Sequence, residues 1–266
     1  MISIVVSSYN RLRHLKLFLQ CCREQTYKDF EIVVADDGSS DGTIEYLDKT
    51  KNKCFFDLDY VTQKDLGFRK SKILNKAIGK TKFDDILFLD ADLLIGPRFV
   101  SNYLEVYEKF KGCLISGKIG RINQKDSLKI TEELIKSDFD KIVLMSSGLE
   151  PENTCYRDDY TGYCDSPFKR SFWHHWVLGG NFICPKKIIY ELNGFDEDFI
   201  GWGGEDNDFA QRISLSGKCK IVLSGVLVAY HLYHSMVGDR SGQRLFNEKK
   251  KFEKTIVRNE GRNVFN

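Results

Sequence analysis

The first 115 residues alternate between short apolar runs and longer helix-like stretches. The apolar runs have the length of strands and cover residues 2–8, 31–35, 60–62 and 86–89. Strands that alternate with helices pair side by side in parallel, and the crossovers between them are right-handed. The alternation therefore predicts an α/β fold with a doubly wound, mostly parallel sheet. Helices are expected near residues 12–25, 43–49, 69–78 and 98–110.

The middle of the chain breaks this alternation. Residues 117–172 are polar and aromatic without a clear period, so we interpret them as an inserted lobe or lid, partly helical near residues 127–136. Apolar runs at residues 177–184 and 221–230 resume the strand pattern. Because 266 residues is a length typical of one domain, we predict a single domain spanning residues 1–266.

Charge, hydropathy and cysteine content narrow the class of protein. The 40 basic and 38 acidic residues give a net charge of +2, which offers no reason to expect nucleic acid as a partner. No apolar run approaches the roughly 20 residues of a membrane span, and the first residues have the pattern of a strand rather than a signal peptide. The eight cysteines include no Cys-x-x-Cys pair, so we interpret them as reduced thiols in a cytoplasmic protein.

The tail, residues 237–266, is charged and helix-like from about residue 240. We interpret its cluster Lys249-Lys250-Lys251 as a solvated face. The weaker alternative is a peripheral contact with an anionic membrane surface, at the inner face of the membrane. The sequence leaves the oligomeric state open.

The stretch from Gly201 to Asp208 combines a tryptophan, three glycines and three carboxylates. Glycines let a backbone approach a ligand closely, and the indole of Trp202 offers an apolar face to a sugar ring. Glu205 and Asp206 stand at the expected start of a helix, where N-capping is the simpler interpretation. Capping accounts for one acid but not for three beside Trp and Gly-Gly, so we favour a functional site.

Two further motifs carry groups that bind metals. Asp90-Ala91-Asp92 follows the apolar run 86–89, and the carboxyl end of a buried strand is where ligands bind in open α/β sheets. His231 and His234 follow the run 221–230; we place His231 at the strand end and His234 in a turn, so that both can reach one ion. Carboxylate and imidazole together suit Mn²⁺ better than Ca²⁺, and Mg²⁺ is the alternative. Two unconnected surface histidines remain the simpler reading of that pair alone.

At this point the motifs resemble a known family. The segments 5–11 and 33–43 look like the opening motifs of family 2 glycosyltransferases, and Asp90-Ala91-Asp92 looks like their metal-binding Asp-x-Asp. Residues 193–208 with His231-x-x-His234 resemble the C-terminal region of β1,4-galactosyltransferases and of bacterial chondroitin-type polymerases. The segment 68–75 matches a further motif of that group.

The resemblance implies a GT-A fold, a UDP-sugar donor, a divalent metal and inversion at the anomeric carbon. It divides the domain into a nucleotide-sugar-binding half at 1–115, the insertion 117–172, an acceptor-binding and metal half at 175–236, and the tail. It assigns Asp206 as catalytic base, Trp202 and Glu205 to the acceptor, and Asp92, His231 and His234 to the metal. The donor would contact Ser8, Asn10, Arg11, Asp37, Phe68, Lys70, Lys72, Asp90 and Gly180, with Gly179 beside the sugar.

We therefore expect an inverting, metal-dependent transferase that moves a hexose or N-acetylhexosamine from a UDP-sugar to a saccharide or lipid-linked saccharide acceptor. The family context suggests bacterial surface-polysaccharide synthesis. Two other classes stay open. A nucleotidyltransferase that makes nucleotide sugars would want a glycine-rich loop near the N-terminus, and residues 7–11 contain no glycine. A non-catalytic carbohydrate-binding protein would not need Asp206 and a metal site together.

Overall fold

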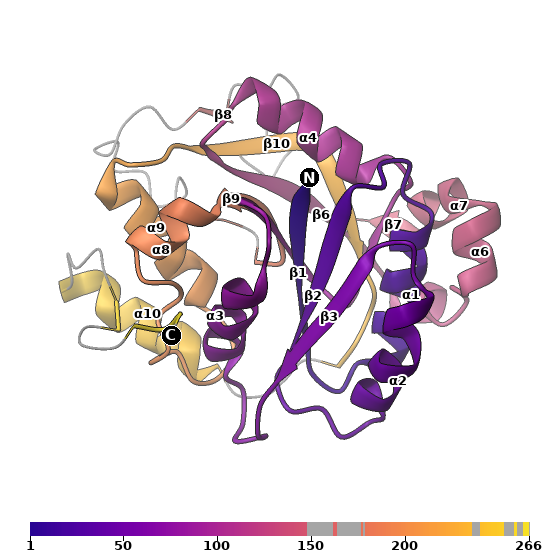
Figure 1. Cartoon of the computed structure of the whole chain (residues 1–266), viewed down its shortest axis with the longest axis horizontal. Coiled ribbons are helices and arrows are strands. Elements are labelled where there is room, and N and C mark those ends of the chain that lie inside the picture. The colour runs from indigo at the N-terminus through magenta and orange to yellow at the C-terminus, as the bar shows by residue number, and fades with distance from the viewer. Residues whose placement is uncertain are drawn as a thin grey trace.

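The computed structural model describes residues 1–147, 162–163, 177, 179–235, 240–252, 258–259 and 263–265, without the side chains of 147, 162–163 and 249–252. These residues form an α/β domain around one mixed sheet with the strand order β3-β2-β1-β4-β9-β6-β10-β5 (Figure 1). The strands on this path are β1 Ile2–Ser8, β2 Phe30–Asp36, β3 Asp57–Thr62, β4 Asp85–Asp90, β5 Leu93–Ile95, β6 Leu114–Ile122, β9 Asn181–Pro185 and β10 Ile221–His231.

The first half of the sheet is parallel, as the alternation of strands and helices predicts. Strands β3, β2, β1 and β4 run in one direction and end at one edge, with Ser8 paired to Asp36 and Ser7 to Asp90. Side chains that are neighbours along a strand point to opposite faces. Val5 accordingly packs into one core, while Ile4 and Val6 pack into the other.

The second half of the sheet is mixed. Strand β9 runs antiparallel between β4 and β6, β6 and β10 are parallel, and β5 pairs antiparallel with the end of β10. The predicted start of the insertion at residue 117 is wrong, because 117–122 belong to β6 inside the sheet. Residues 116–122 do not alternate strictly between polar and apolar side chains, because Ile119 and Ile122 are three residues apart, so the segment lacks the period of two typical of a strand.

Helices cover both faces of the sheet. Helices α1 Leu12–Arg23, α2 Thr43–Thr50, α4 Phe99–Lys109, α6 Glu132–Ser137 and α7 Phe139–Leu144 pack on the core that contains Ile4. Helices α3 Lys70–Lys80, α8 Lys186–Glu191 and α9 Glu205–Ser216 pack on the opposite core, and α10 Ser241–Phe252 lies beside α9 (Figure 1).

The segment after β6 is helical where it is described. It contains α5 Gln124–Ser127, α6, α7 and the short strands β7 Ser146–Ser147 and β8 Gly162–Tyr163. Within the predicted lid, residues 148–161 and 164–172 lie outside the described residues, as do the side chains of Lys249–Lys251. Within the described part of the chain, no helix is both long enough and apolar enough to cross a membrane.

Candidate active site

A cavity of about 850 Å³ opens at the carboxyl ends of the parallel strands. Strands β1 and β4 end in it with Ser8 and Asp90, as ligand sites in open α/β sheets do. Most of the residues predicted from the sequence line it, although they come from positions more than 200 residues apart. They are Ser8, Arg11, Asp37, Phe68, Lys70, Asp90, Asp92, Trp202, Glu205, Asp206, His231 and His234, with Gly179.

Three predicted donor ligands do not line the cavity. The side chain of Asn10 accepts a hydrogen bond from the Ser40 N–H at 2.8 Å, so it joins the loops after β1 and β2 instead. Gly180 has a φ of +82°, and a Cβ there would collide with the carboxylate of Asp90, so this glycine leaves room for another site residue. Lys72 lies in the first turn of α3 but outside the cavity lining.

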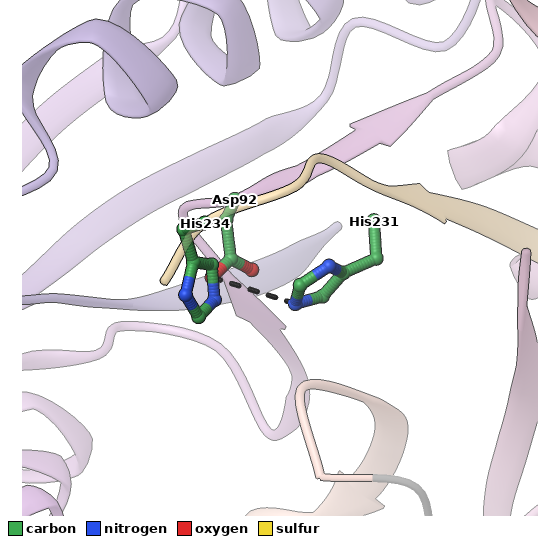
Figure 2. Close-up of side chains that lie close together, drawn as sticks. All are labelled: Asp92, His231 and His234. Carbon is green, nitrogen blue, oxygen red and sulfur yellow. Dashed lines mark ion pairs between the residues drawn. The ribbon is translucent and has the colours of Figure 1, made fainter. Parts of the chain in front are cut away.

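Asp92, His231 and His234 form a cluster that suits a metal ion (Figure 2). One ligand atom from each lies within 4.8 Å of the others. The Nε2 atoms of His234 and His231 lie 3.0 Å and 3.7 Å from Oδ2 of Asp92. As predicted, His231 ends strand β10 and His234 follows it.

The environment of Asp92 fits a metal ligand. Its Oδ1 atom is buried and has no hydrogen-bond partner among the described residues. Burial alone would raise the pKa of Asp92, but the hydrogen bond from His234 and the two nearby imidazoles outweigh it and lower the pKa. A buried, ionised carboxylate with a free oxygen beside two imidazoles is a donor set for Mn²⁺ or a similar divalent ion.

A second cluster surrounds the ammonium group of Lys70. Its Nζ atom lies 3.0 Å from Asp90 Oδ1, 3.6 Å from Glu205 Oε1 and 3.8 Å from Asp206 Oδ2. Burial would lower the pKa of Lys70, but the three carboxylates outweigh it and hold the pKa well above its usual value. The hydroxyl of Ser7 donates a hydrogen bond to the same oxygen of Asp90. Lys70 is therefore a fixed positive charge among three acids.

Asp206 is the carboxylate in this cluster whose proton affinity changes most. Burial raises its pKa to about 8, with Glu205 and Asp90 adding to the effect and Lys70 opposing it. A Cβ at Gly179 would collide with the Asp206 carboxylate. The carboxylate can therefore occupy its observed position only because residue 179 has no side chain. A carboxyl group with a pKa near the working pH suits proton transfer.

Asp208, the rival acid in the same loop, has a structural role. It is buried, accepts a hydrogen bond from Arg212 Nε at 2.7 Å and lies 3.1 Å from Arg258 Nη2. It does not line the cavity. Each carboxylate oxygen of Asp208 is held by one guanidinium group, and the residue lies outside the cavity lining, so Asp208 is not placed to contact a ligand there. Ion pairing with Arg212 and Arg258, and not N-capping, therefore accounts for Asp208, while Asp206 lines the cavity.

The loop before α9 presents Trp202 at the cavity mouth. Its side chain is 43% exposed, which is high for a tryptophan and leaves a ring face open to a ligand. Gly203 and Gly204 have φ values of +92° and +95°, a region that favours glycine. The guanidinium carbon of Arg240 lies 5.7 Å from the centre of the Trp202 ring and supports it by a cation–π contact.

Asp37 also lines the cavity. Its carboxylate accepts hydrogen bonds from the Arg69 N–H at 2.7 Å and from Gln63 Nε2 at 2.6 Å. Burial raises its pKa, while these two hydrogen bonds act in the opposite direction. Both partners hold the carboxylate still, and the second lone pairs of its oxygens can accept from a ligand.

Several residues of the cavity lining are absent from the sequence prediction. Lys118 and Arg121 enter it from β6, and Tyr9 and Asn123 lie nearby in the lining. The two cations were missed because 117–122 were interpreted as insertion. Residues 116–122 carry no strict alternation of polar and apolar side chains, so the local sequence carries no clear signal of a strand here.

Family comparisons cover nearly the whole chain. The family described as "Glycosyl transferase family 2" matches residues 3–171, more than half of the chain. The family described as "N-terminal domain of galactosyltransferase" matches residues 164–235, which include the acidic loop and both histidines.

Curated relatives include two polymer synthases and a glucosyltransferase. The chondroitin synthase of Escherichia coli is 28% identical over 244 residues, covering 86% of this chain and 34% of that protein. The hyaluronan synthase of Pasteurella multocida is 30% identical over 245 residues, covering 86% and 24%. The validoxylamine A glucosyltransferase of Streptomyces hygroscopicus subsp. jinggangensis is 29% identical over 229 residues, covering 82% and 52%. The chain thus spans between about a quarter and about half of these relatives.

Solved structures share the fold. TarS 1-349 of S. aureus in complex with UDP matches with a TM-score of 0.61 at 17% identity, covering 86% of this chain and 59% of that chain. The mannosyltransferase PcManGT from Pyrobaculum calidifontis, in complex with GDP-Man and Mn²⁺, matches with a TM-score of 0.61 at 17% identity, covering 88% and 57%. These likenesses confirm the predicted GT-A fold.

Proposed function

The chain belongs to glycosyl transferase family 2, and we propose that it transfers a hexose or N-acetylhexosamine from a UDP-sugar to a saccharide hydroxyl, with inversion. One observation carries this proposal most directly. The metal-type cluster and the Asp206 carboxylate beside Trp202 line the same cavity. A nucleoside diphosphate leaving group and an acceptor hydroxyl need these two kinds of group on either side of one sugar.

The donor side of the cavity is assigned to Asp37, Arg11 and the metal cluster. Asp37 would accept the N3–H of uracil, a donor that cytosine lacks. Asp92, His231 and His234 would hold Mn²⁺, or Mg²⁺ as the alternative, and the ion would supply Lewis-acid stabilisation of the diphosphate charge. Lys70 adds a fixed positive charge between Asp90 on this side and Asp206 on the acceptor side.

The acceptor side is assigned to Trp202, Glu205 and Asp206. The open ring face of Trp202 would stack on the acceptor sugar. As the acceptor oxygen bonds to the anomeric carbon, its proton passes to a carboxylate oxygen of Asp206, and the bond from that carbon to the diphosphate oxygen breaks. Charge is balanced, because the carboxylate loses one negative charge and the diphosphate gains one. Proton removal of this kind contributes about 10²–10⁴-fold in rate.

The names of the relatives point to polymer synthesis. We propose that the acceptor is a saccharide chain or a lipid-linked saccharide of a surface polysaccharide, and that the reaction takes place in the cytoplasm, with a peripheral membrane contact through Lys249–Lys251 as the weaker alternative to a solvated face. The relatives that match are glycosyltransferases, so a nucleotide-sugar-forming enzyme and a silent carbohydrate-binding protein are both less well supported.

A donor and acceptor screen tests the proposal. The wild-type chain is incubated with UDP-Gal, UDP-GalNAc, UDP-Glc, UDP-GlcNAc or UDP-GlcA, and with chondroitin or hyaluronan oligosaccharides or validoxylamine A. We expect UDP release and an extended product in the presence of Mn²⁺, loss of both in excess EDTA, and an inverted anomeric configuration by NMR. Asp206→Asn should lower kcat by about 10²-fold or more with donor binding retained. Glu205 is the rival base, so Glu205→Gln is measured in the same assay. Full activity in EDTA contradicts the metal assignment.

A further inference from the structure

The two histidines of the metal cluster lie on a short turn, residues 231–234, that three other parts of the chain hold in place. The N–H of Leu232 donates to the carbonyl of Asp92 at 2.9 Å. The N–H of Tyr233 donates to the hydroxyl oxygen of Ser127 at 2.8 Å. The carbonyl of Tyr233 lies 3.4 Å from Nε2 of His14. Both polar backbone atoms of Tyr233, the residue directly before His234, therefore have partners outside the turn.

Ser127 is well placed to act as an anchor. It is the last residue of α5 and is only 3% exposed. Its own hydroxyl hydrogen is directed to the carbonyl of Ile122 at 3.4 Å, so its oxygen lone pairs are left to accept from Tyr233. The guanidinium of Arg13 donates to the carbonyls of Ser127 and Ile130 at 2.8 Å and 3.0 Å, which fixes the end of α5 to α1.

We propose that Ser127, with His14 opposite, is a positioning residue that holds the 231–234 turn in the geometry that binds the metal. Neither residue belongs to the cluster itself. A turn that is free to move must be ordered when the ion binds, and that ordering weakens affinity. Groups outside the ligand set that orient the ligands commonly affect affinity for this reason. The inference rests on the proposed metal site, and it gives the segment after β6 a role in the site.

The test measures Mn²⁺ binding directly, by electron paramagnetic resonance of the free ion, in the wild type and in variants of the full chain. Ser127→Ala should weaken Mn²⁺ binding roughly three- to tenfold, the effect of one lost neutral hydrogen bond. Ser127→Thr keeps the hydroxyl and should restore binding. His14→Ala should weaken binding from the opposite side of the turn and serves as the second variant if Ser127→Ala does not fold.

Ser137→Ala is the matched control. Ser137 ends α6 in the same segment, and its hydroxyl donates to the Glu133 carbonyl at 2.8 Å, but it touches no part of the turn. We expect its Mn²⁺ affinity to equal that of the wild type. If Ser127→Ala and His14→Ala both fold and both bind Mn²⁺ like the control, the inference is wrong. If the wild type itself binds no Mn²⁺ and no Mg²⁺, the metal site of the proposed function has failed instead.

Discussion

Gly179 offers a direct probe of where Asp206 must lie. A Cβ at this position would collide with Oδ2 of Asp206 and lie 3.5 Å from its Cβ. The Asp206 carboxylate would have to move by about 1 Å to make room, and a displacement of that size at a reacting group can cost about 10²-fold in rate.

We therefore expect Gly179→Ala to lower kcat by about 10²-fold while donor affinity stays nearly unchanged. The same crowding should lower the free energy of unfolding by only about 1–3 kcal/mol, the usual effect of overpacking. Transfer kinetics under the conditions found in the donor screen, with calorimetric titration of UDP and a thermal melt, separate these effects.

Gly79→Ala is the matched control for this substitution. Gly79 lies inside α3, has no positive φ, and a Cβ there would meet only the Phe265 carbonyl, at 3.9 Å. It should gain up to about 1 kcal/mol of stability from helix propensity and keep wild-type kcat. A kcat for Gly179→Ala within twofold of the control would refute the assigned position of Asp206.

Three further outcomes are expected. Asp37→Ala should weaken UDP binding by about 1–3 kcal/mol in calorimetry, because one charge-assisted hydrogen bond is lost, and unchanged affinity would remove Asp37 from the uracil site. A carboxyl whose pKa is raised by folding to about 8 binds its proton more tightly in the folded state, so it destabilises the fold increasingly as pH rises from about 4 to 8. The melting temperature of Asp206→Asn minus that of the wild type should therefore increase as pH rises through this window. A difference that stays constant with pH would contradict the raised pKa. Arg258→Met removes a partner of the buried Asp196 and Asp208, and it should cost about 3–5 kcal/mol of unfolding free energy in a denaturant melt; a loss below 1 kcal/mol would show that this network is not essential.

Most of the elements can be predicted from local sequence because they depend on local patterns. The apolar strands β1, β2 and β4 and the helices between them follow from periodicity, and the turn that carries His234 follows from two histidines placed after an apolar run. Strand β6 was not predicted because it lacks a period of two and includes Lys118 and Arg121, cations that a strand between two neighbours seldom carries unless they face a cavity.

The roles within the acidic loop could not be predicted from the loop itself. Asp206 and Asp208 are two residues apart and chemically identical, so local sequence treats them alike. The fold separates them, since Asp208 is buried against Arg212 and Arg258 while Asp206 meets Lys70 in the cavity. The partner that decides each role comes from a distant part of the chain.

The sequence by itself determined the alternation of strands and helices in the first half of the sheet, the family, and the residue types that any transferase of this kind needs. Only the tertiary structure decided which of them meet. Lys70 stands at the start of α3 and Asp206 at the start of α9, and they lie 3.8 Å apart because both helices pack on the same face of the sheet and begin at the same edge of it. Periodicity records which face of an element is apolar, but not which other element will cover that face.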